Sequence, residues 1–130
     1  MPEVSGAESA AIGFNDAITR GDLDGLVRLM TPDHTFTDSA GSVVSGREAC
    51  REAWAGFFAA FPGYRNVFTA VATSGDVVIL AGYSECSEPA LAGRALWRAT
   101  VSGDRVASWA VSEDSAANRD RLGLPRDVGA

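Results

Sequence analysis

Residues 46–73 read GREACREAWAGFFAAFPGYRNVFTAVAT, and the spacing of the apolar residues changes within this stretch. Before Pro62 the large apolar side chains recur three or four positions apart, which predicts one face of an amphipathic helix. That face comprises Cys50, Trp54, Phe57, Phe58 and Phe61. After Tyr64 apolar and polar residues alternate, which is typical of a strand. The change from helical to strand spacing indicates that helices precede a sheet.

The residues before this stretch predict two more helices. A capping box of Ser5 and Glu8 predicts a helix over about residues 6–20. Asp22 is a suitable cap for a second helix, which we expect Pro32 to end.

The segment 34–38 alternates and is rich in Thr and Phe, which predicts the first strand. A second capping box, formed by Ser45 and Glu48, is expected to open the helix that Pro62 ends.

Four further strands are predicted downstream, over residues 65–73, 77–86, 94–101 and 105–113. Because turn sequences such as Ser74-Gly75-Asp76 separate neighbouring strands, we expect the strands to pair antiparallel. A short helix over about residues 116–122 is expected to end at Gly123. Helices followed by strands predict an α+β fold, with one face of the sheet covered by the helices, in a single domain of residues 1–130.

The composition excludes several kinds of chemistry. The 130 residues are 46% hydrophobic and 22% charged, which is typical of one globular domain. All 11 basic residues are Arg, so lysine Schiff bases, pyridoxal-phosphate anchors and phosphate-loop lysines are excluded. The net charge of −6 leaves no basic tract for nucleic acid, and we expect no nucleic-acid partner.

The scarcity of His and Cys narrows the expectations further. With His34 as the only histidine, one chain cannot assemble a three-histidine zinc site or a two-histidine iron site, and we expect neither a metal nor another cofactor. Cys50 and Cys86 are too few for a disulfide scaffold and are expected to be reduced thiols. The N-terminal sequence lacks the regions of a signal peptide, and no apolar run approaches ~20 residues, so we expect a cytoplasmic protein with no membrane partner.

Four segments together resemble a known family. They are residues 14–27 (FNDAITRGDLDGLV), 34–41 (HTFTDSAG), 46–61 (GREACREAWAGFFAAF) and 109–124, which end in LGL. The chain resembles the SnoaL-like polyketide cyclase and ketosteroid isomerase branch of the nuclear transport factor 2-like superfamily. The resemblance implies a cone in which a curved antiparallel sheet wraps around N-terminal helices and encloses an apolar pocket. It also implies a homodimer formed through the outer face of the sheet.

In chemical terms, the resemblance implies a cofactor-independent isomerisation or cyclisation of a polyketide-like or steroid-like compound. A carboxylate removes a proton next to a carbonyl in such reactions. Asp38 stands where the resemblance expects this general base, at the end of the first strand. Strand alternation places His34, Phe36 and Asp38 on one face, which is the pocket face if Phe36 enters the core. Asp38 is then either the base or a cap of the turn to Gly41, and His34 is either a second catalytic group or a group at the rim or in the core.

The hydrogen-bond donors that the isomerases use differ in this sequence. The tyrosine expected on the first helix corresponds to Phe14, which has no hydroxyl. The protonated acid expected on the penultimate strand corresponds to Trp97, whose indole N–H is a donor. We therefore expect Trp97 and Tyr83 to donate to a substrate carbonyl, which suits a cyclase better than a ketosteroid isomerase.

Aromatic side chains are expected to line a pocket for a flat, apolar substrate. The candidate substrate-binding residues are Phe14, Phe36, Trp54, Phe58, Phe61, Tyr83, Trp97 and Trp109. The alternative is ordinary core packing, which is the role expected for Phe57.

Two other functions remain open on the sequence. One is a non-catalytic module for ligand binding or dimerisation, and a cavity of ~300 Å³ or more with Asp38 on its wall would favour a ligand site over a filled core. The other is an epoxide-opening hydrolase or cyclase, which would need a second acid beside Asp38. The candidates for that acid are Glu85, Glu113 and Asp114.

Overall fold

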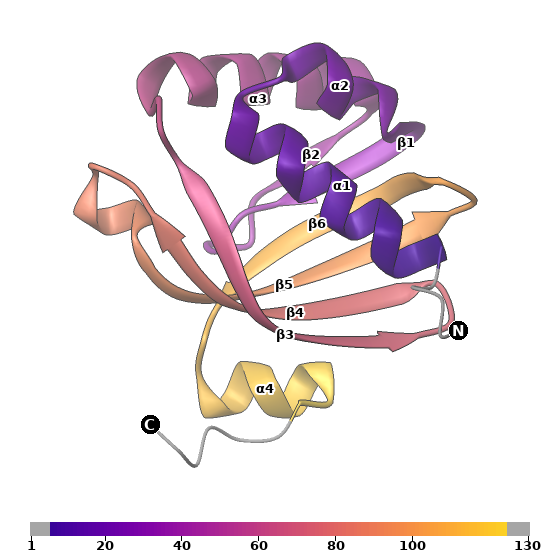
Figure 1. The fold of residues 1–130 in the computed structure, drawn as a ribbon, viewed down its shortest axis with the longest axis vertical. Helices are drawn as coiled ribbons and strands as arrows, with labels where there is room; N and C mark the ends of the chain where they lie inside the picture. The colour runs from indigo at the N-terminus through magenta and orange to yellow at the C-terminus, as the bar shows by residue number, and fades with distance from the viewer. Residues whose placement is uncertain (1–5, 125–130) are drawn as a thin grey trace.

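The structure is a computed structural model that describes residues 6–124, and it has the predicted α+β order (Figure 1). Its N-terminal half contains α1 (Gly6–Arg20), α2 (Leu23–Arg28), β1 (Met30–Thr37), β2 (Val43–Ser45) and α3 (Arg47–Ala60). Its C-terminal half contains β3 (Arg65–Ser74), β4 (Val77–Glu85), β5 (Gly93–Ser102), β6 (Arg105–Glu113) and α4 (Ala116–Leu122). One turn of 3-10 helix, Pro89–Leu91, lies between β4 and β5.

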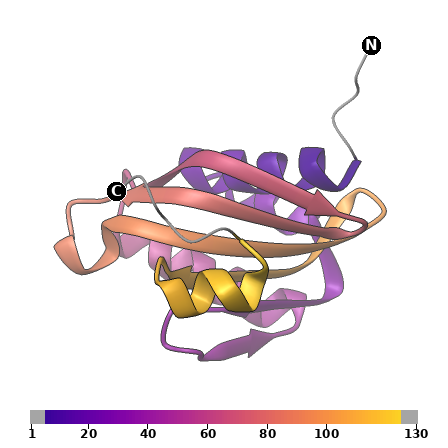
Figure 2. The ribbon, with the colours of Figure 1, turned by 90° about the horizontal axis from the view of Figure 1, so that it is seen from below.

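The six strands form one curved, unclosed sheet in the order β2-β1-β6-β5-β4-β3. Neighbours pair antiparallel except β1 and β6, which are parallel, so the antiparallel expectation is wrong for that pair. No short turn joins β1 to β6, and the long connection between them allows the parallel direction. Helix α1 lies across the concave face, whereas α4 packs against β5 on the opposite face (Figures 1 and 2).

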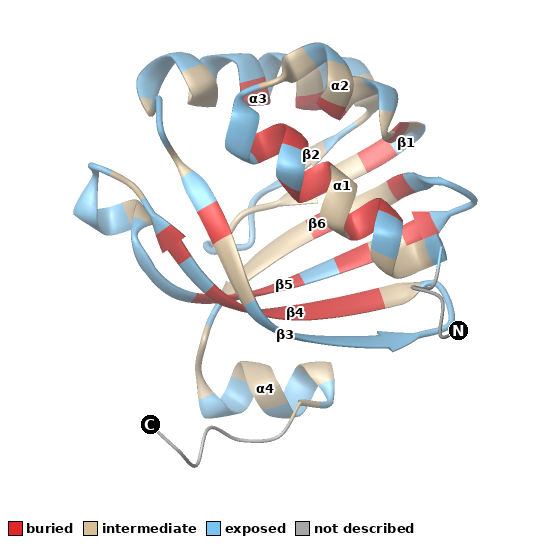
Figure 3. Cartoon of the chain, viewed as in Figure 1, coloured by how far each residue is buried: buried red, intermediate tan, exposed pale blue. Residues whose placement is uncertain are grey.

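The main core lies between α1 and the concave face of the sheet (Figure 3). Phe14 and Ile18 recur at helical spacing and are almost fully buried. They meet side chains from alternate positions of the strands, including Leu80, Trp97 and Trp109. Each large apolar side chain buried in this way contributes about 1.5–3 kcal/mol to folding. The sheet and the helices that cover it therefore form one packed unit.

Two predicted boundaries differ from the structure around β1. Helix α2 ends at Arg28 rather than at Pro32, and β1 already begins at Met30. Pro32 is tolerated inside β1 because the register with β6 shifts between Met30 and Thr35, where no ladder hydrogen bond requires its missing N–H.

The cap of α3 also differs from the prediction. Ser45 belongs to β2, and the N-cap is Gly46, which makes no side-chain cap and has a φ of 95°. The backbone N–H of Gly46 donates instead to the carbonyl of His34 over 2.8 Å. The first predicted capping residue, Ser5, lies outside the described residues.

At the other end of the chain, Gly123 caps α4 with a φ of 75°, as predicted. Within residues 6–124, none of the helices is long and apolar enough to cross a lipid bilayer.

Candidate active site

A cavity of about 700 Å³ lies between the concave face of the sheet, α3 and the connection from β4 to β5. This volume is within the range of small-molecule sites. All three tryptophans of the chain line the cavity, together with other aromatic side chains. The aromatic lining comprises Phe36, Trp54, Phe57, Phe61, Tyr64, Trp97 and Trp109. The cavity is therefore suited to a flat, largely apolar molecule.

Asp38 lies on the wall of this cavity and also caps the β1–β2 turn. Its Oδ1 accepts the backbone N–H groups of Ala40 and Ser42, each over 2.9 Å. Its Oδ2 has no hydrogen-bond partner among residues 6–124. The capping interpretation therefore holds for Oδ1, while Oδ2 is the oxygen that a general base would use.

A buried polar network forms a further part of the cavity wall. Asn15 on α1 and Asn66 on β3 bond to each other, and Ser84 on β4 donates to Oδ1 of Asn66 over 2.7 Å. The Tyr64 hydroxyl lies 3.2 Å from Oγ of Ser84. Tyr64, Asn66 and Ser84 all line the cavity. Burial raises the pKa of Tyr64, so its hydroxyl remains protonated at neutral pH.

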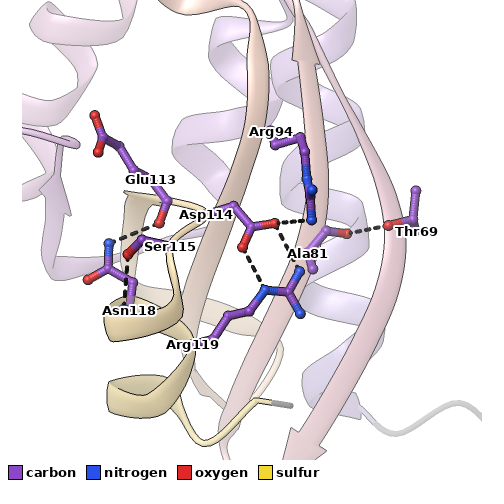
Figure 4. Close-up of polar contacts among 8 residues, drawn as sticks. All are labelled: Thr69, Ala81, Arg94, Glu113, Asp114, Ser115, Asn118 and Arg119. Atoms are coloured by element: carbon purple, nitrogen blue, oxygen red, sulfur yellow. Dashed lines mark hydrogen bonds and ion pairs between the residues drawn. The ribbon is translucent and has the colours of Figure 1, made fainter. Parts of the chain in front are cut away.

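The acids at the end of β6 have two different environments (Figure 4). The side chain of Asp114 is 4% exposed and accepts hydrogen bonds from Arg119 over 2.6 Å and from Arg94 over 2.8 Å. The hydrogen bond from Arg119 lowers the pKa of Asp114. Glu113 also lines the cavity, and Figure 4 shows its carboxylate pointing away from Asp114. Glu85 does not line the cavity and pairs with Arg65 in a half-exposed ion pair.

His34 lies in the core and does not line the cavity. Its side chain is fully buried, stacks on Phe14 at a centroid distance of 5.4 Å and bonds through Nδ1 to the carbonyl of Val106 over 2.6 Å. Because a carbonyl only accepts, Nδ1 carries the proton, and Nε2 is a buried atom with no hydrogen-bond partner within residues 6–124. Burial lowers the pKa of His34. These contacts indicate a structural group rather than a catalytic one.

Three other predicted site residues lie off the cavity. Phe14 is buried in the core against His34 and Trp109, and Phe58 packs against Trp54 at a centroid distance of 5.6 Å without lining the cavity. Tyr83 is on the opposite face of the sheet, because Ser84 and its alternate neighbours form the inward row of β4.

The other candidates, namely Phe36, Trp54, Phe61, Trp97 and Trp109, do line the cavity. Phe57, which was expected in the core, lines it as well. Among residues 6–124, no three His, Cys, Asp or Glu side chains converge closely enough to hold a metal ion.

A family model described as a SnoaL-like domain matches residues 11–119, which is most of the chain. The chain belongs to the SnoaL-like domain family. The resemblance seen in the sequence is thereby confirmed. A comparison with curated proteins finds no relative of this SnoaL-like domain.

Solved structures share the fold of this SnoaL-like domain at low sequence identity. A protein from Shewanella putrefaciens CN-32, named as a candidate SnoaL-like polyketide cyclase, has a TM-score of 0.77 and 18% identity, with 93% of this chain and 88% of that chain covered. TerC, co-crystallised with polyporic acid, has a TM-score of 0.72 and 16% identity, with 92% and 98% covered.

A further match is a hypothetical protein with a ketosteroid isomerase-like fold from Catenulispora acidiphila DSM 44928, in complex with trimethylamine. It has a TM-score of 0.71 and 20% identity, with 93% and 97% covered. At these identities the likeness establishes the fold alone.

Sequence reasoning missed the polar wall of the SnoaL-like domain. Tyr64 precedes β3 directly, and Asn66 and Ser84 occupy inward positions of β3 and β4. The available signal was that Asn66 and Ser84 stand among apolar residues of predicted strands. A polar residue at a buried position needs a partner, and two on neighbouring strands supply one another.

Proposed function

We propose that the cavity binds a flat, largely apolar carbonyl compound, and that Asp38 is the general base of its cofactor-independent isomerisation or cyclisation. The observation that supports this proposal is the state of the Asp38 carboxylate. Two backbone N–H groups fix Oδ1, while Oδ2 is left without a partner among residues 6–124 on the wall of an aromatic cavity. A base held in this way loses little freedom when it meets its substrate.

In the proposed reaction, Oδ2 of Asp38 takes a proton from the carbon next to the carbonyl. The electron pair of that C–H bond moves into the new C=C bond, and the carbonyl oxygen becomes an enolate oxygen. Trp97, which lines the cavity from β5, would donate its indole N–H to this oxygen.

Two outcomes of the enolate keep the protons balanced. In an isomerisation, Asp38 returns the proton to a different carbon of the extended enolate. In a cyclisation, the enolate carbon attacks a second carbonyl of the same molecule, and the proton held by Asp38 neutralises the new alkoxide.

The experiment measures proton exchange, which does not require knowledge of the natural product. The fused-ring ketone 2-tetralone is incubated with the protein in deuterium oxide, and NMR follows the replacement of its α-protons by deuterium. The wild-type protein is expected to accelerate the exchange, and Asp38→Asn to lose at least ~100-fold of that acceleration. Asp33→Asn serves as the matched control, since Asp33 lies exposed on β1, the strand that Asp38 directly follows.

Binding is followed separately, because all three tryptophans line the cavity and their fluorescence reports on its occupancy. Polyporic acid, the compound crystallised with TerC, is a suitable first probe. Exchange that survives in Asp38→Asn would rule out Asp38 as the base. A ligand that binds without exchange or turnover would instead support the non-catalytic binding module.

The position of Glu113 on the cavity wall supports epoxide opening as the second candidate function. It is a second carboxylate on the wall of the same cavity, whereas Asp114 is bound by two arginines. In this reaction one carboxylate would take a proton from water, and the other, protonated, would give its proton to the opening oxygen. Loss of styrene oxide hydrolysis in both Asp38→Asn and Glu113→Gln would support it over the carbonyl reaction.

A further inference from the structure

The hydrogen-bond network beside the cavity has a direction that its end group fixes. The backbone carbonyl of Asn66 only accepts, so the side-chain atom of Asn15 that contacts it is the amide nitrogen. Oδ1 of Asn15 therefore faces Asn66, where it accepts from Nδ2 over 3.0 Å. The remaining polar atom of the Asn66 side chain, Oδ1, is consequently an acceptor directed at Ser84.

This direction continues through Ser84 to Tyr64. A serine hydroxyl has one proton, and Ser84 uses it for the 2.7 Å hydrogen bond to Oδ1 of Asn66. In the contact between Tyr64 and Ser84, Ser84 is then the acceptor and the Tyr64 hydroxyl is the donor. Asn66 and Ser84 are 7% and 6% exposed, so few alternative partners reach them.

Tyr64 is the last residue of this hydrogen-bond network, and it lines the cavity. Its only hydroxyl proton is directed at Ser84, and the raised pKa of the partly buried phenol keeps that proton in place at neutral pH. What the hydroxyl has left to offer a cavity ligand is a lone pair on its oxygen. The edge of the Phe57 ring, 4.8 Å away between centroids, restrains the Tyr64 ring.

We infer that Tyr64 is a specificity-determining residue that accepts a hydrogen bond, so that the ligand of this cavity carries a hydroxyl or N–H donor as well as its carbonyl group. This inference deepens the proposed function, on whose cavity it rests, and it narrows the substrate class to hydroxylated or amino-substituted carbonyl compounds. A ligand with acceptors only would leave the Tyr64 lone pair buried without a hydrogen-bond donor and would bind more weakly.

The test compares indole with benzofuran, two probes of nearly the same shape. Indole has a ring N–H that donates, whereas benzofuran has a ring oxygen in its place. Their dissociation constants are measured by titrating each into the isotope-labelled protein and following backbone NMR shifts. The wild-type protein is expected to bind indole about tenfold more tightly. In Tyr64→Phe the ratio of the two dissociation constants is expected to fall to about one. Tyr83→Phe is the control: it removes a tyrosine hydroxyl from the opposite face of the sheet and is expected to leave the ratio unchanged.

The outcomes separate this inference from the proposed function. Equal affinities in the wild-type protein, or a preference that survives in Tyr64→Phe, would overturn the role of Tyr64 while leaving the exchange catalysed by Asp38 untouched. Asp38→Asn is expected to lose exchange on 2-tetralone and to keep the preference for indole. Binding of neither probe would contradict the aromatic ligand site and, with it, both proposals. A crystal structure with indole supplies an independent measurement, in which the ring nitrogen should lie about 2.7–3.2 Å from the Tyr64 oxygen.

Discussion

The backbone N–H of Ser42 donates to Oδ1 of Asp38 over 2.9 Å, so the proposed base also holds the turn from β1 to β2. The stability of the turn requires an acceptor at Oδ1, whereas base chemistry requires the negative charge. Substitutions at Asp38 can therefore separate the two roles.

Asp38→Ala is expected to lower the free energy of unfolding by about 1–2 kcal/mol, because the N–H groups of Ala40 and Ser42 lose their acceptor. Asp38→Asn keeps an acceptor oxygen and is expected to cost less than about 0.5 kcal/mol. Urea unfolding measures both. Equal destabilisation would show that the charge, and not the acceptor, holds the turn.

His34 predicts a dependence of stability on pH. Burial lowers the pKa of His34 in the folded chain, so the unfolded chain binds a proton more readily. The contribution of neutral His34 is complete above about pH 6.5, the ordinary histidine pKa, and decreases as the pH falls below it. One proton gives a slope of at most about 1.4 kcal/mol per pH unit.

Urea unfolding between pH 5 and 8 measures this slope, and His34 is the only histidine in the chain. His34→Asn keeps a donor for the Val106 carbonyl but does not titrate, and it is expected to flatten the curve over this range. An unchanged slope in His34→Asn would assign the pH dependence to other groups.

The order of the elements was predictable because the local signals are strong in this sequence. Turn sequences such as Ser74-Gly75-Asp76 bound the strands, and the apolar face of α3 has a clear helical period. The parallel pairing of β1 with β6 was not predictable, since it depends on where a long connection returns to the sheet.

The cavity wall was harder to predict, because strand alternation gives two rows of side chains but does not say which row faces inward. A change of one position exchanges the rows, and Tyr83, which was expected to line the pocket, lies in the outward row. Ser84, its neighbour, is the residue that points into the cavity. Tyr64 precedes its strand, so its direction depends on the path of the chain after Pro62 and not on alternation.

The ion pair between Asp114 and Arg119 is expected to hold α4 on the sheet. Arg119 donates to both oxygens of the Asp114 carboxylate, over 2.6 and 2.9 Å (Figure 4). Arg119→Ala leaves Asp114 buried with a weaker set of partners and is expected to lower the free energy of unfolding by about 2–3 kcal/mol. Hydrogen exchange of the α4 amides is expected to become faster. The matched control on the same helix is Arg121→Ala, which removes only exposed hydrogen bonds and should cost less than about 0.5 kcal/mol.

Stability is expected to fall with falling pH at Asp114 as it does at His34, but for a different reason. Burial disfavours the charged form of His34, whereas Arg119 favours the charged form of Asp114. The hydrogen bond from Arg119 lowers the pKa of Asp114, so the contribution is complete above about pH 4 and decreases as the pH falls further. The loss caused by Arg119→Ala should therefore shrink below pH 4. An equal loss at pH 3 and pH 7 would contradict an ionic origin.

Two glycines give opposite predictions for the same substitution. At Gly82 on β4, a Cβ atom would meet the backbone carbonyl of Val67 and the Cα of Phe68 at 2.9 Å, where β3 shifts register. Because backbone atoms on a neighbouring strand cannot move aside alone, Gly82→Ala is expected to lower the free energy of unfolding by about 2 kcal/mol or more. At Gly56 on α3, a Cβ atom meets nothing within 4 Å, and Gly56→Ala is expected to stabilise the chain by up to about 1 kcal/mol. Thermal unfolding of the two variants measures both effects, and a neutral Gly82→Ala would show that β3 and β4 separate more easily than their close approach indicates.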